Sequence, residues 1–313
     1  DHLAPLIANK LAMVGGADYN RPGGQINMAT TATRQPGSSF KMFTYTAAIE
    51  SGRLNMVSPI LDQPMTFPLG GGTDGYKPYQ PQNYDLKYHG TVPLKVAMGN
   101  SLNIPAIKTE LTIGIPAVLD TARRMGVTTL TQKDSSYGIS LTLGGYAVPP
   151  LDMATSASTL ATLGVRHQPA PISHIVDGLG KQIFSYEAKK NEFRAVSPQT
   201  AFIVDSIMSD DRNRCLEFGC GGDLTLPGRH VAAKTGTTQD FRDNWTVGFT
   251  PSLATAVWVG NPDYQPLSHN STGIVGAAPI CPQFMLQALA QKPDEWYPVP
   301  AGGARVCGHY LLP

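Results

Sequence analysis

The chain has 313 residues, of which 42% are apolar and 15% are charged. A composition this rich in apolar residues excludes a disordered, collagen-like or coiled-coil protein and predicts a sizeable buried core. The 24 basic and 23 acidic side chains leave a formal net charge of +1, so the chain lacks the basic excess typical of nucleic acid binding. The length allows one large domain with a smaller part, or two domains.

No segment is apolar over the roughly 18 residues that a membrane-spanning helix needs. The most apolar segment, residues 253–259, has the length of a strand. The first ten residues lack the basic stretch, apolar run and small-residue cleavage site of a signal peptide, and the strand-like LAMVGG follows almost at once. We therefore expect a piece of a longer protein.

The first predicted element is an amphipathic helix over residues 38–50, between the Pro36-Gly37 turn and Gly52. Residues 59–93 are rich in Pro, Gly, Tyr and Asn and include a glycine run at 70–72. They predict a long ordered connection that its aromatic side chains pack down. Helices are predicted next over residues 93–98, 104–111, 116–125 and 151–163.

In the second half, a period of two predicts a hairpin over residues 172–187 with its tip at 177–180. Ser197 and Pro198 predict the start of a helix over residues 199–208. The last third contains three predicted strands, an apolar helix and an irregular tail, over residues 230–238, 244–250, 253–259, 282–290 and from 293 onward. Because strands and helices are segregated, the pattern favours an α+β fold with a mostly antiparallel sheet flanked by helices.

The four cysteines stand at positions 215, 220, 281 and 307, without the spacing of a zinc site. Cys215 and Cys220 are near enough in sequence to close a short loop. Cys281 and Cys307 are then the remaining pair. Two disulfides in an exported protein and four free thiols both stay open.

The first candidate for chemistry is Ser38-x-x-Lys41, at the start of the first helix. Positions i and i+3 share a helix face, so the Lys41 amine can reach the Ser38 hydroxyl. A lysine whose pKa is lowered by burial or by a neighbouring cation can act as the base for a serine nucleophile. The neighbouring Ser39 lies on another face and is not expected to replace Ser38.

The second candidate is Ser101-x-Asn103, in a predicted loop between two helices. A serine in this setting can relay a proton to a leaving amine, and the asparagine can hold a lysine and a substrate carbonyl. The third is Lys234-Thr235-Gly236-Thr237-Thr238, at the end of a predicted strand. Its glycine allows a close backbone approach, its threonines can bind a carboxylate, and its lysine supplies positive charge.

Each motif alone is weak, but their order is that of penicillin-binding proteins and class A β-lactamases. The chain further resembles the transpeptidase domain of class A, bifunctional, penicillin-binding proteins. The resemblance fades before residue 11 and after about residue 289. It is carried by these segments: LAMVGG, DYNRPGGQ, RQPGSSFK, NYDLKYHG, NSLNIPA, LTLGGYAVPPLDMATSASTLA and AAKTGTTQDFRDNWTVGFTP.

The resemblance implies a penicillin-binding, serine β-lactamase-like fold with a helical subdomain, and a role for each motif residue. Ser38 would be the acylated nucleophile, Lys41 its base and Ser101 the proton relay. Asn103 would position the lysine and the substrate. The substrate-binding strand end would be Lys234, Thr235, Gly236, Thr237 and Thr238, and the backbone N–H groups of Ser38 and Thr237 would form the oxyanion hole. His89 would lie near the cleft.

The implied reaction is serine D,D-transpeptidation. Its partners would be peptidoglycan stem peptides, as D-Ala-D-Ala donor and amine acceptor, and β-lactam antibiotics that acylate the same serine. No metal or organic cofactor and no nucleic acid is implied. Residues 1–10 would be the remnant of a preceding region, 11–290 the transpeptidase domain and 291–313 a C-terminal tail. A membrane anchor and a glycosyltransferase domain outside these residues would place the protein on the extracytoplasmic face of the bacterial membrane.

Three other functions share parts of this pattern. A class A β-lactamase needs a glutamate that holds the deacylating water, and the glutamates at 110, 187, 192 and 217 stand in no Glu-x-x-Leu-Asn setting. A D,D-carboxypeptidase, which passes the acyl group to water, has the same motifs. A β-lactam sensor, acylated without turnover, would lack the NYDLKYHG and FRDNWTVGFTP segments.

Overall fold

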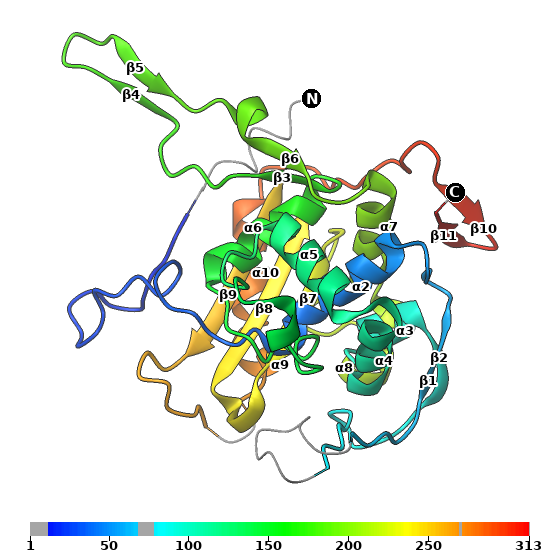
Figure 1. Cartoon of the computed structure of the whole chain (residues 1–313). Coiled ribbons are helices and arrows are strands. Elements are labelled where there is room, and N and C mark those ends of the chain that lie inside the picture. Colours follow the sequence, from blue (N-terminus) through cyan, green and yellow to red (C-terminus); the bar gives the residue numbers. More distant parts are fainter. Residues whose placement is uncertain (1–11, 68–77, 269–270, 313) are drawn as a thin grey trace.

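The centre of the fold is a three-stranded antiparallel sheet made of β7 (Ala232–Thr237), β8 (Asp243–Thr250) and β9 (Leu253–Gly260), in the order β7-β8-β9 (Figure 1). The computed structural model describes residues 12–67, 78–268 and 271–312. The predicted remnant at residues 1–10 and the glycine run at 70–72 lie outside these ranges. All three strands were predicted, with bounds differing by one or two residues.

The two faces of this sheet are covered by different helices. Trp245, Val247 and Phe249 of β8 are fully buried in the main core, which includes side chains of α2 (Lys41–Glu50), α6 (Pro150–Ala161) and α7 (Pro198–Ser209). A Cβ on Gly248 would instead lie 2.9 Å from Cys281 Sγ of α10 (Ile280–Ala288). Since successive side chains of a strand alternate between faces, the sheet lies between α6 and α10, as Figure 1 shows.

Helix α2 runs through the middle of the helical part. The sequence predicts one apolar face, but every residue from Lys41 to Ile49 is buried. The helix contacts the sheet side through α7 and the other side through α4 (Asn103–Ile113) and α5 (Ile115–Met125). A helix enclosed on all sides holds its start in one position; Lys41 is its first residue, and Ser38 lies in η1 directly before it.

Two predictions about irregular segments were wrong. Within residues 59–93, β1 (Pro59–Asp62) pairs with β2 (Gly90–Pro93) in an antiparallel ladder. In the tail, β10 (Ala304–Val306) pairs with β11 (His309–Leu311), and Trp296 and Tyr310 pack on the main core. The tail is therefore attached to the domain.

The hairpin predicted near residue 172 is confirmed as β4 (His174–Val176) and β5 (Gln182–Ser185), which project from the body with exposed residues (Figure 1). Ser197 caps α7 as predicted, because its Oγ accepts from Thr200 N at 3.2 Å. The remaining short elements are α3 (Leu94–Gly99), α8 (Cys215–Phe218), α9 (Gly273–Gly276), β3 (Val165–His167), β6 (Glu192–Arg194) and five 3₁₀ turns, η1 (Gly37–Phe40), η2 (Asp134–Ser136), η3 (Ala188–Asn191), η4 (Asp211–Asn213) and η5 (Gln239–Phe241).

The cysteines adopt neither of the two arrangements left open by the sequence. Cys215 and Cys220 form a disulfide, whereas Cys281 is a buried free thiol and Cys307 an exposed one. The disulfide closes a loop around α8. Over residues 12–67, 78–268 and 271–312, no helix has the length and apolar character needed to cross a membrane.

Candidate active site

The Ser-x-x-Lys motif spans the junction between η1 and α2. Lys41 Nζ lies 2.9 Å from Ser38 Oγ, so the predicted pairing of the two side chains is present. Gly37, just before Ser38, has a φ of 55° and forms the sharp entry into the turn. Ser38 lies one turn ahead of α2, where the helix dipole favours negative charge. Ser39 points elsewhere, with its hydroxyl donating to the Pro36 carbonyl at 2.7 Å.

The Ser-x-Asn motif lies directly against Lys41. The Lys41 ammonium or amine contacts the Ser101 carbonyl, lies 2.6 Å from Asn103 Oδ1 and is 3.4 Å from Ser101 Oγ. Ser101 itself has a φ of 59°, an unusual value for a residue other than glycine. The strained turn aims both the carbonyl and the hydroxyl of Ser101 at Lys41.

Lys234 approaches the same hydroxyl from the sheet. Its Nζ donates to Ser101 Oγ at 2.8 Å and to the Thr235 carbonyl at 3.0 Å. Ser101 Oγ is therefore shared by two lysines that stand on opposite sides of the site. The three motifs, spread from residue 38 to residue 238, converge within hydrogen-bonding distance of one another.

Both lysines are buried, and burial is the main cause of their altered ionisation. Burial lowers the pKa of Lys41 well below its usual value, and the Lys234 charge lowers it further. Burial together with the Arg214 charge lowers the pKa of Lys234 to about 7. A buried cation is disfavoured because it loses its hydration. For Lys41, burial thus favours the uncharged form, which can accept a proton.

The contacts of Lys41 also allow that uncharged form. A neutral amine has two N–H donors and one lone pair. The Ser101 carbonyl and Asn103 Oδ1 can only accept, so they use the two donors. The lone pair is then left for the proton of the Ser38 hydroxyl, the third close neighbour. This is the arrangement of a base next to its nucleophile.

The end of β7 packs directly on the backbone of η1. A Cβ on Gly236 would lie 2.2 Å from the Pro36 carbonyl oxygen, so only glycine fits there. A Cβ on Gly37 would in turn lie 2.9 Å from the backbone nitrogen of Thr237. The turn that carries Ser38 and the strand that carries Thr237 are therefore in close backbone contact.

The three threonines at the end of β7 and just after it differ in their hydrogen-bond partners. Thr235 is 5% exposed, and the hydroxyl of Thr237 accepts from Gly273 N at 2.8 Å. The Thr238 hydroxyl accepts from Asp243 N at 2.9 Å and lies 3.2 Å from the Asp243 carboxylate. The Thr238 side chain thus links the end of β7 to the start of β8.

Asn83 is a residue of the site that sequence reasoning missed. Its Oδ1 accepts from Asn103 N at 2.8 Å and from Ile104 N at 3.3 Å, so it satisfies the first N–H groups of α4. Its Nδ2 donates to Asp62 at 2.8 Å. Asn83 falls in the NYDLKYHG segment, but its spacing from Asn103 gives no signal of the contact.

Glu217 of α8 was also missed as a site residue. Its carboxylate acts electrostatically on both lysines and raises the pKa of each. Burial and the Asp85 charge raise the pKa of Glu217 itself, whereas His89, Lys41 and Lys234 lower it. His89 Nε2 lies 3.1 Å from the Asp85 carboxylate. Glu217 thus interacts with Asp85 and His89 as well as with the two lysines.

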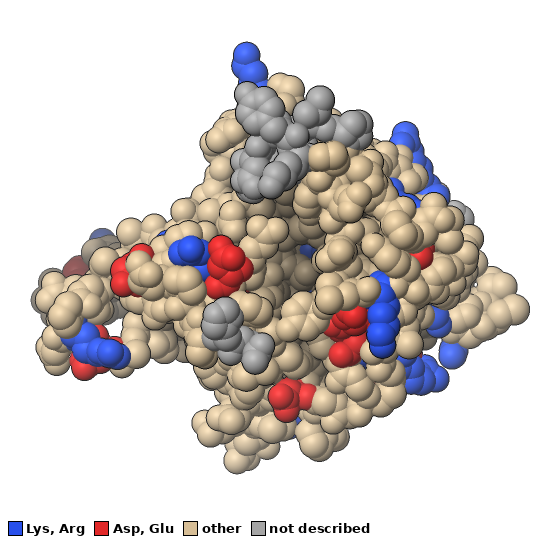
Figure 2. Space-filling view, turned by 90° about the horizontal axis from the view of Figure 1, so that it is seen from below, with Lys and Arg blue, Asp and Glu red and all other residues tan. Residues whose placement is uncertain are grey.

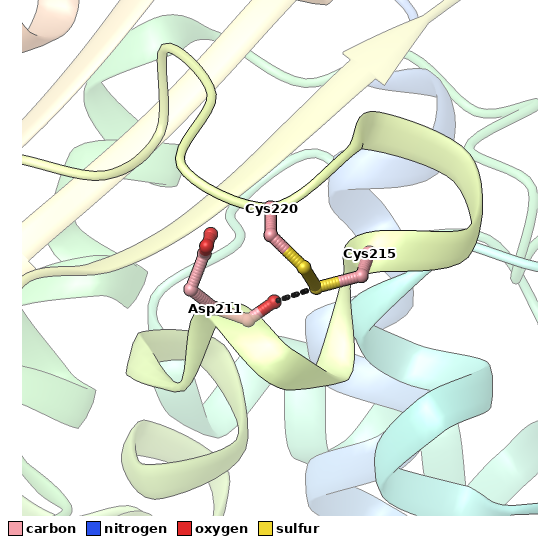
Figure 3. A group of neighbouring side chains, drawn as sticks. All are labelled: Asp211, Cys215 and Cys220. Carbon is pink, nitrogen blue, oxygen red and sulfur yellow. Dashed lines mark hydrogen bonds between the residues drawn. A yellow bond between two sulfur atoms is a disulfide. The ribbon is translucent and has the colours of Figure 1, made fainter.

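One group of side chains has the composition of a metal site. Asp211, Cys215 and Cys220 offer atoms within 4.8 Å of one another (Figure 3). The two sulfurs are bonded to each other, so they offer no thiolate. The Asp211 carboxylate already accepts from Gly221 N and from Thr225 Oγ1. Cys215 Sγ lies 3.3 Å from the Asp211 carbonyl oxygen, a contact without a proton to donate. These side chains stabilise the loop in which they lie, over residues 211–225.

The molecular face in Figure 2 is mostly uncharged, with small mixed groups of acidic and basic side chains and a hollow near its centre. No broad field of one sign covers the part of this face that is described. A large groove of about 820 Å³ lies elsewhere, between residues 12–29, α6 and β9, and includes none of the motif residues.

Comparison with known proteins gives the family. The profile described as "Penicillin binding protein transpeptidase domain" matches residues 8–285. Penicillin-binding protein 1A from Neisseria lactamica is 32% identical over 305 residues, covering 96% of this chain and 37% of that protein. Penicillin-binding protein 1A from Aquifex aeolicus is 33% identical over 92% of this chain and 38% of its own length. The chain spans little more than a third of these relatives.

Solved structures agree on the fold. Penicillin-binding protein 1A from Haemophilus influenzae has a TM-score of 0.77 and 27% identity, covering 93% of this chain and 47% of that chain. The penicillin-binding protein PonA1 from Mycobacterium tuberculosis has a TM-score of 0.78 and 29% identity over 96% of this chain and 78% of that chain. PonA1 is also known in complex with penicillin V. The predicted α+β fold and the resemblance to class A proteins are confirmed: the chain belongs to the penicillin-binding protein transpeptidase domain family.

Proposed function

We propose that this domain is a serine D,D-transpeptidase that works through an acyl-enzyme on Ser38. The observation that carries the proposal is the position of Lys41 Nζ, 2.9 Å from Ser38 Oγ and buried, with a lowered pKa. A serine needs such a base to attack an amide near neutral pH. The family and the penicillin V complex of the PonA1 relative support β-lactams as inhibitors of the same serine.

In the acylation step, Ser38 Oγ attacks the carbonyl of the D-Ala-D-Ala bond and its proton passes to Lys41 Nζ. The oxyanion is stabilised by the backbone N–H groups of Ser38 and Thr237, a role supported by the close approach of η1 and β7. The C–N bond then breaks, Ser101 Oγ passes a proton to the leaving D-Ala amine, and Lys41 gives its proton to Ser101 in exchange. Its contacts with both lysines support this relay.

In the second step, the amine of a neighbouring stem peptide attacks the Ser38 ester. The amine passes a proton through Ser101 Oγ to Lys41, the new amide forms, and Ser38 Oγ leaves with that proton, returned from Lys41. Asn103 holds Lys41 and the substrate, and Lys234 with Thr235 and Thr237 binds the terminal carboxylate. Gly236 supplies the close backbone approach of the strand. Thr238 supports this strand end through its contacts with Asp243.

We further propose that the domain acts outside the cytoplasmic membrane, as part of a longer anchored protein with a peptidoglycan glycosyltransferase domain. The Cys215–Cys220 disulfide supports an oxidising compartment. The small share of the relatives' length that this chain covers supports further domains. Within the longer protein, we assign residues 11–290 to the transpeptidase and 291–313 to a tail packed on it.

A labelled penicillin tests the nucleophile. The wild type is expected to become covalently labelled, and Ser38→Ala is expected to lose the label, because it removes the hydroxyl that lies 2.9 Å from Lys41 Nζ. The matched control is Ser39→Ala, which removes the adjacent hydroxyl and is expected to remain labelled. Equal labelling of the wild type and Ser38→Ala would overturn the assignment.

Product analysis separates transpeptidation from D,D-carboxypeptidation. A synthetic stem peptide that ends in D-Ala-D-Ala is incubated with the domain, with and without an amine acceptor peptide. The proposal predicts a crosslinked product that increases with acceptor concentration. A hydrolysed donor as the sole product at every acceptor concentration would assign the carboxypeptidase reaction instead.

A further inference from the structure

The turn that holds Ser101 is strained and needs support from its surroundings. Ser101 has a φ of 59°, a left-handed conformation that costs free energy for a residue with a side chain. Its carbonyl and its hydroxyl both point at Lys41, and its hydroxyl also receives Lys234. A small rotation of this turn would therefore move two groups away from Lys41 at once.

Asn100, the residue before Ser101, is tied to its surroundings by every group of its side chain. It is 2% exposed. Its Nδ2 donates to the carbonyls of Val96 at 2.9 Å and Asn213 at 2.7 Å. Its Oδ1 accepts from Glu217 N at 2.9 Å. The amide thus links the end of α3 to a segment more than a hundred positions later in the chain.

That segment is the disulfide loop, by which we mean residues 211–225. The Cys215–Cys220 bond closes it around α8 (Figure 3). The Asp211 carboxylate accepts from Gly221 N and from Thr225 Oγ1. The loop also touches α3 directly, because a Cβ on Gly99 would lie 2.3 Å from the Asn213 carbonyl oxygen. The two partners that Asn100 binds in the loop are therefore held in place from within it.

We propose that Asn100 is a positioning residue for the acyl-transfer reaction, and that the disulfide loop exists in this chain to hold it. Asn100 fixes the Ser101 turn so that its carbonyl orients Lys41 and its hydroxyl stays between the two lysines. The inference rests on the proposed function, because it assigns Ser101 and Lys41 to the reaction. Asn100 touches neither substrate nor the reacting atoms, and it acts through Ser101.

The experiment measures acylation by a fluorescent penicillin in single-turnover conditions, separating the rate from the amplitude. Two variants act on the proposed connection from opposite ends: Asn100→Ala, and Cys215→Ser combined with Cys220→Ser. The matched control is Asn191→Ala, whose side-chain amide also donates to a backbone carbonyl, that of Glu187, on the exposed surface. Thermal unfolding of each variant measures how much of it is folded.

The proposal predicts that Asn100→Ala lowers the saturating acylation rate of the folded protein about tenfold or more, because small displacements of reacting groups have large effects on rate. The double cysteine variant is expected to lower the rate in the same direction by less. Combining the two is expected to add nothing beyond Asn100→Ala, since both act through one contact. Asn191→Ala keeps the wild-type rate.

A merely structural role gives a different result. It would reduce the labelled amplitude and the unfolding temperature, while the folded fraction would react at the wild-type rate, and this would overturn the proposal. If Asn100→Ala does not fold, the acylation rate of the double cysteine variant is the test. A wild-type rate in that variant overturns the role of the loop. Absence of labelling in the wild type would overturn the proposed function and this inference together. Equal acylation rates of the wild type and Asn100→Ala would overturn this inference alone.

Discussion

The two halves of the site are held by different means. In the helical half, polar side chains make the contacts: Lys41 binds the Ser101 carbonyl and Asn103 Oδ1, and Asn83 Oδ1 accepts from Asn103 N. In the sheet half, backbone holds backbone, because Gly236 and Gly37 bring β7 and η1 into direct contact. The helical half should therefore respond to loss of polar groups, and the sheet half to any added carbon atom.

The strongest test of the helical half is Lys41→Met, which keeps the length of the side chain but removes the amine. We expect the acylation rate by penicillin to fall by about 10² to 10⁴, the usual contribution of a general base. Lys190→Met is the control, because Lys190 is an exposed lysine whose ammonium pairs with Glu187. A Lys41→Met rate within a few-fold of the wild type would remove Lys41 from the mechanism.

The sheet half is tested by Gly236→Ala. The added Cβ would lie 2.2 Å from the Pro36 carbonyl oxygen, a backbone atom that can move away only with η1. We expect a loss of stability of about 1–3 kcal/mol or more, measured as a lower unfolding temperature, together with slower acylation. The control is Gly178→Ala in the exposed hairpin, where a Cβ meets nothing within 4 Å. Equal stability of the two variants would contradict the backbone contact.

The smallest expected effect on acylation is that of Glu217→Gln, because Glu217 acts on a lysine of each half. The Glu217 charge raises the pKa of both lysines, so its removal lowers both pKa values. Lys41 then becomes uncharged at lower pH and Lys234 loses its charge at lower pH. The whole pH profile of acylation should therefore move to lower pH.

The control for this prediction is Glu187→Gln, which removes an exposed carboxylate paired with Lys190. Its pH profile should match that of the wild type. A profile of Glu217→Gln that does not move, or moves to higher pH, would show that Glu217 does not act on the lysines.

Much of this architecture can be predicted from local patterns. The helix with Ser38 and Lys41, the cap at Ser197 and the three central strands have local signals of periodicity, capping and turns. β1 and β2 were missed because each has only four residues and both contain or adjoin breakers. Short strands are defined by their partners, which a local pattern does not contain.

The supporting residues of the site were missed for the same physical reason. Asn100 forms hydrogen bonds with Asn213 and Glu217, which are 113 and 117 positions away, and no local sequence pattern predicts those partners. The pairing of the cysteines could also not be predicted. Cys215 and Cys220 are close in sequence and pair, whereas Cys281 is buried against the sheet and Cys307 is exposed in the tail. Sequence separation alone could not decide between them.

The central claim is that the buried Lys41 makes Ser38 the one acylated residue. The most direct measurement is mass spectrometry of the protein after incubation with penicillin, with the adduct mapped to a peptide and followed over time. The account predicts an adduct of the mass of penicillin on Ser38 that persists for many minutes. An adduct on another residue, or one that disappears within seconds as in a β-lactamase, would contradict it.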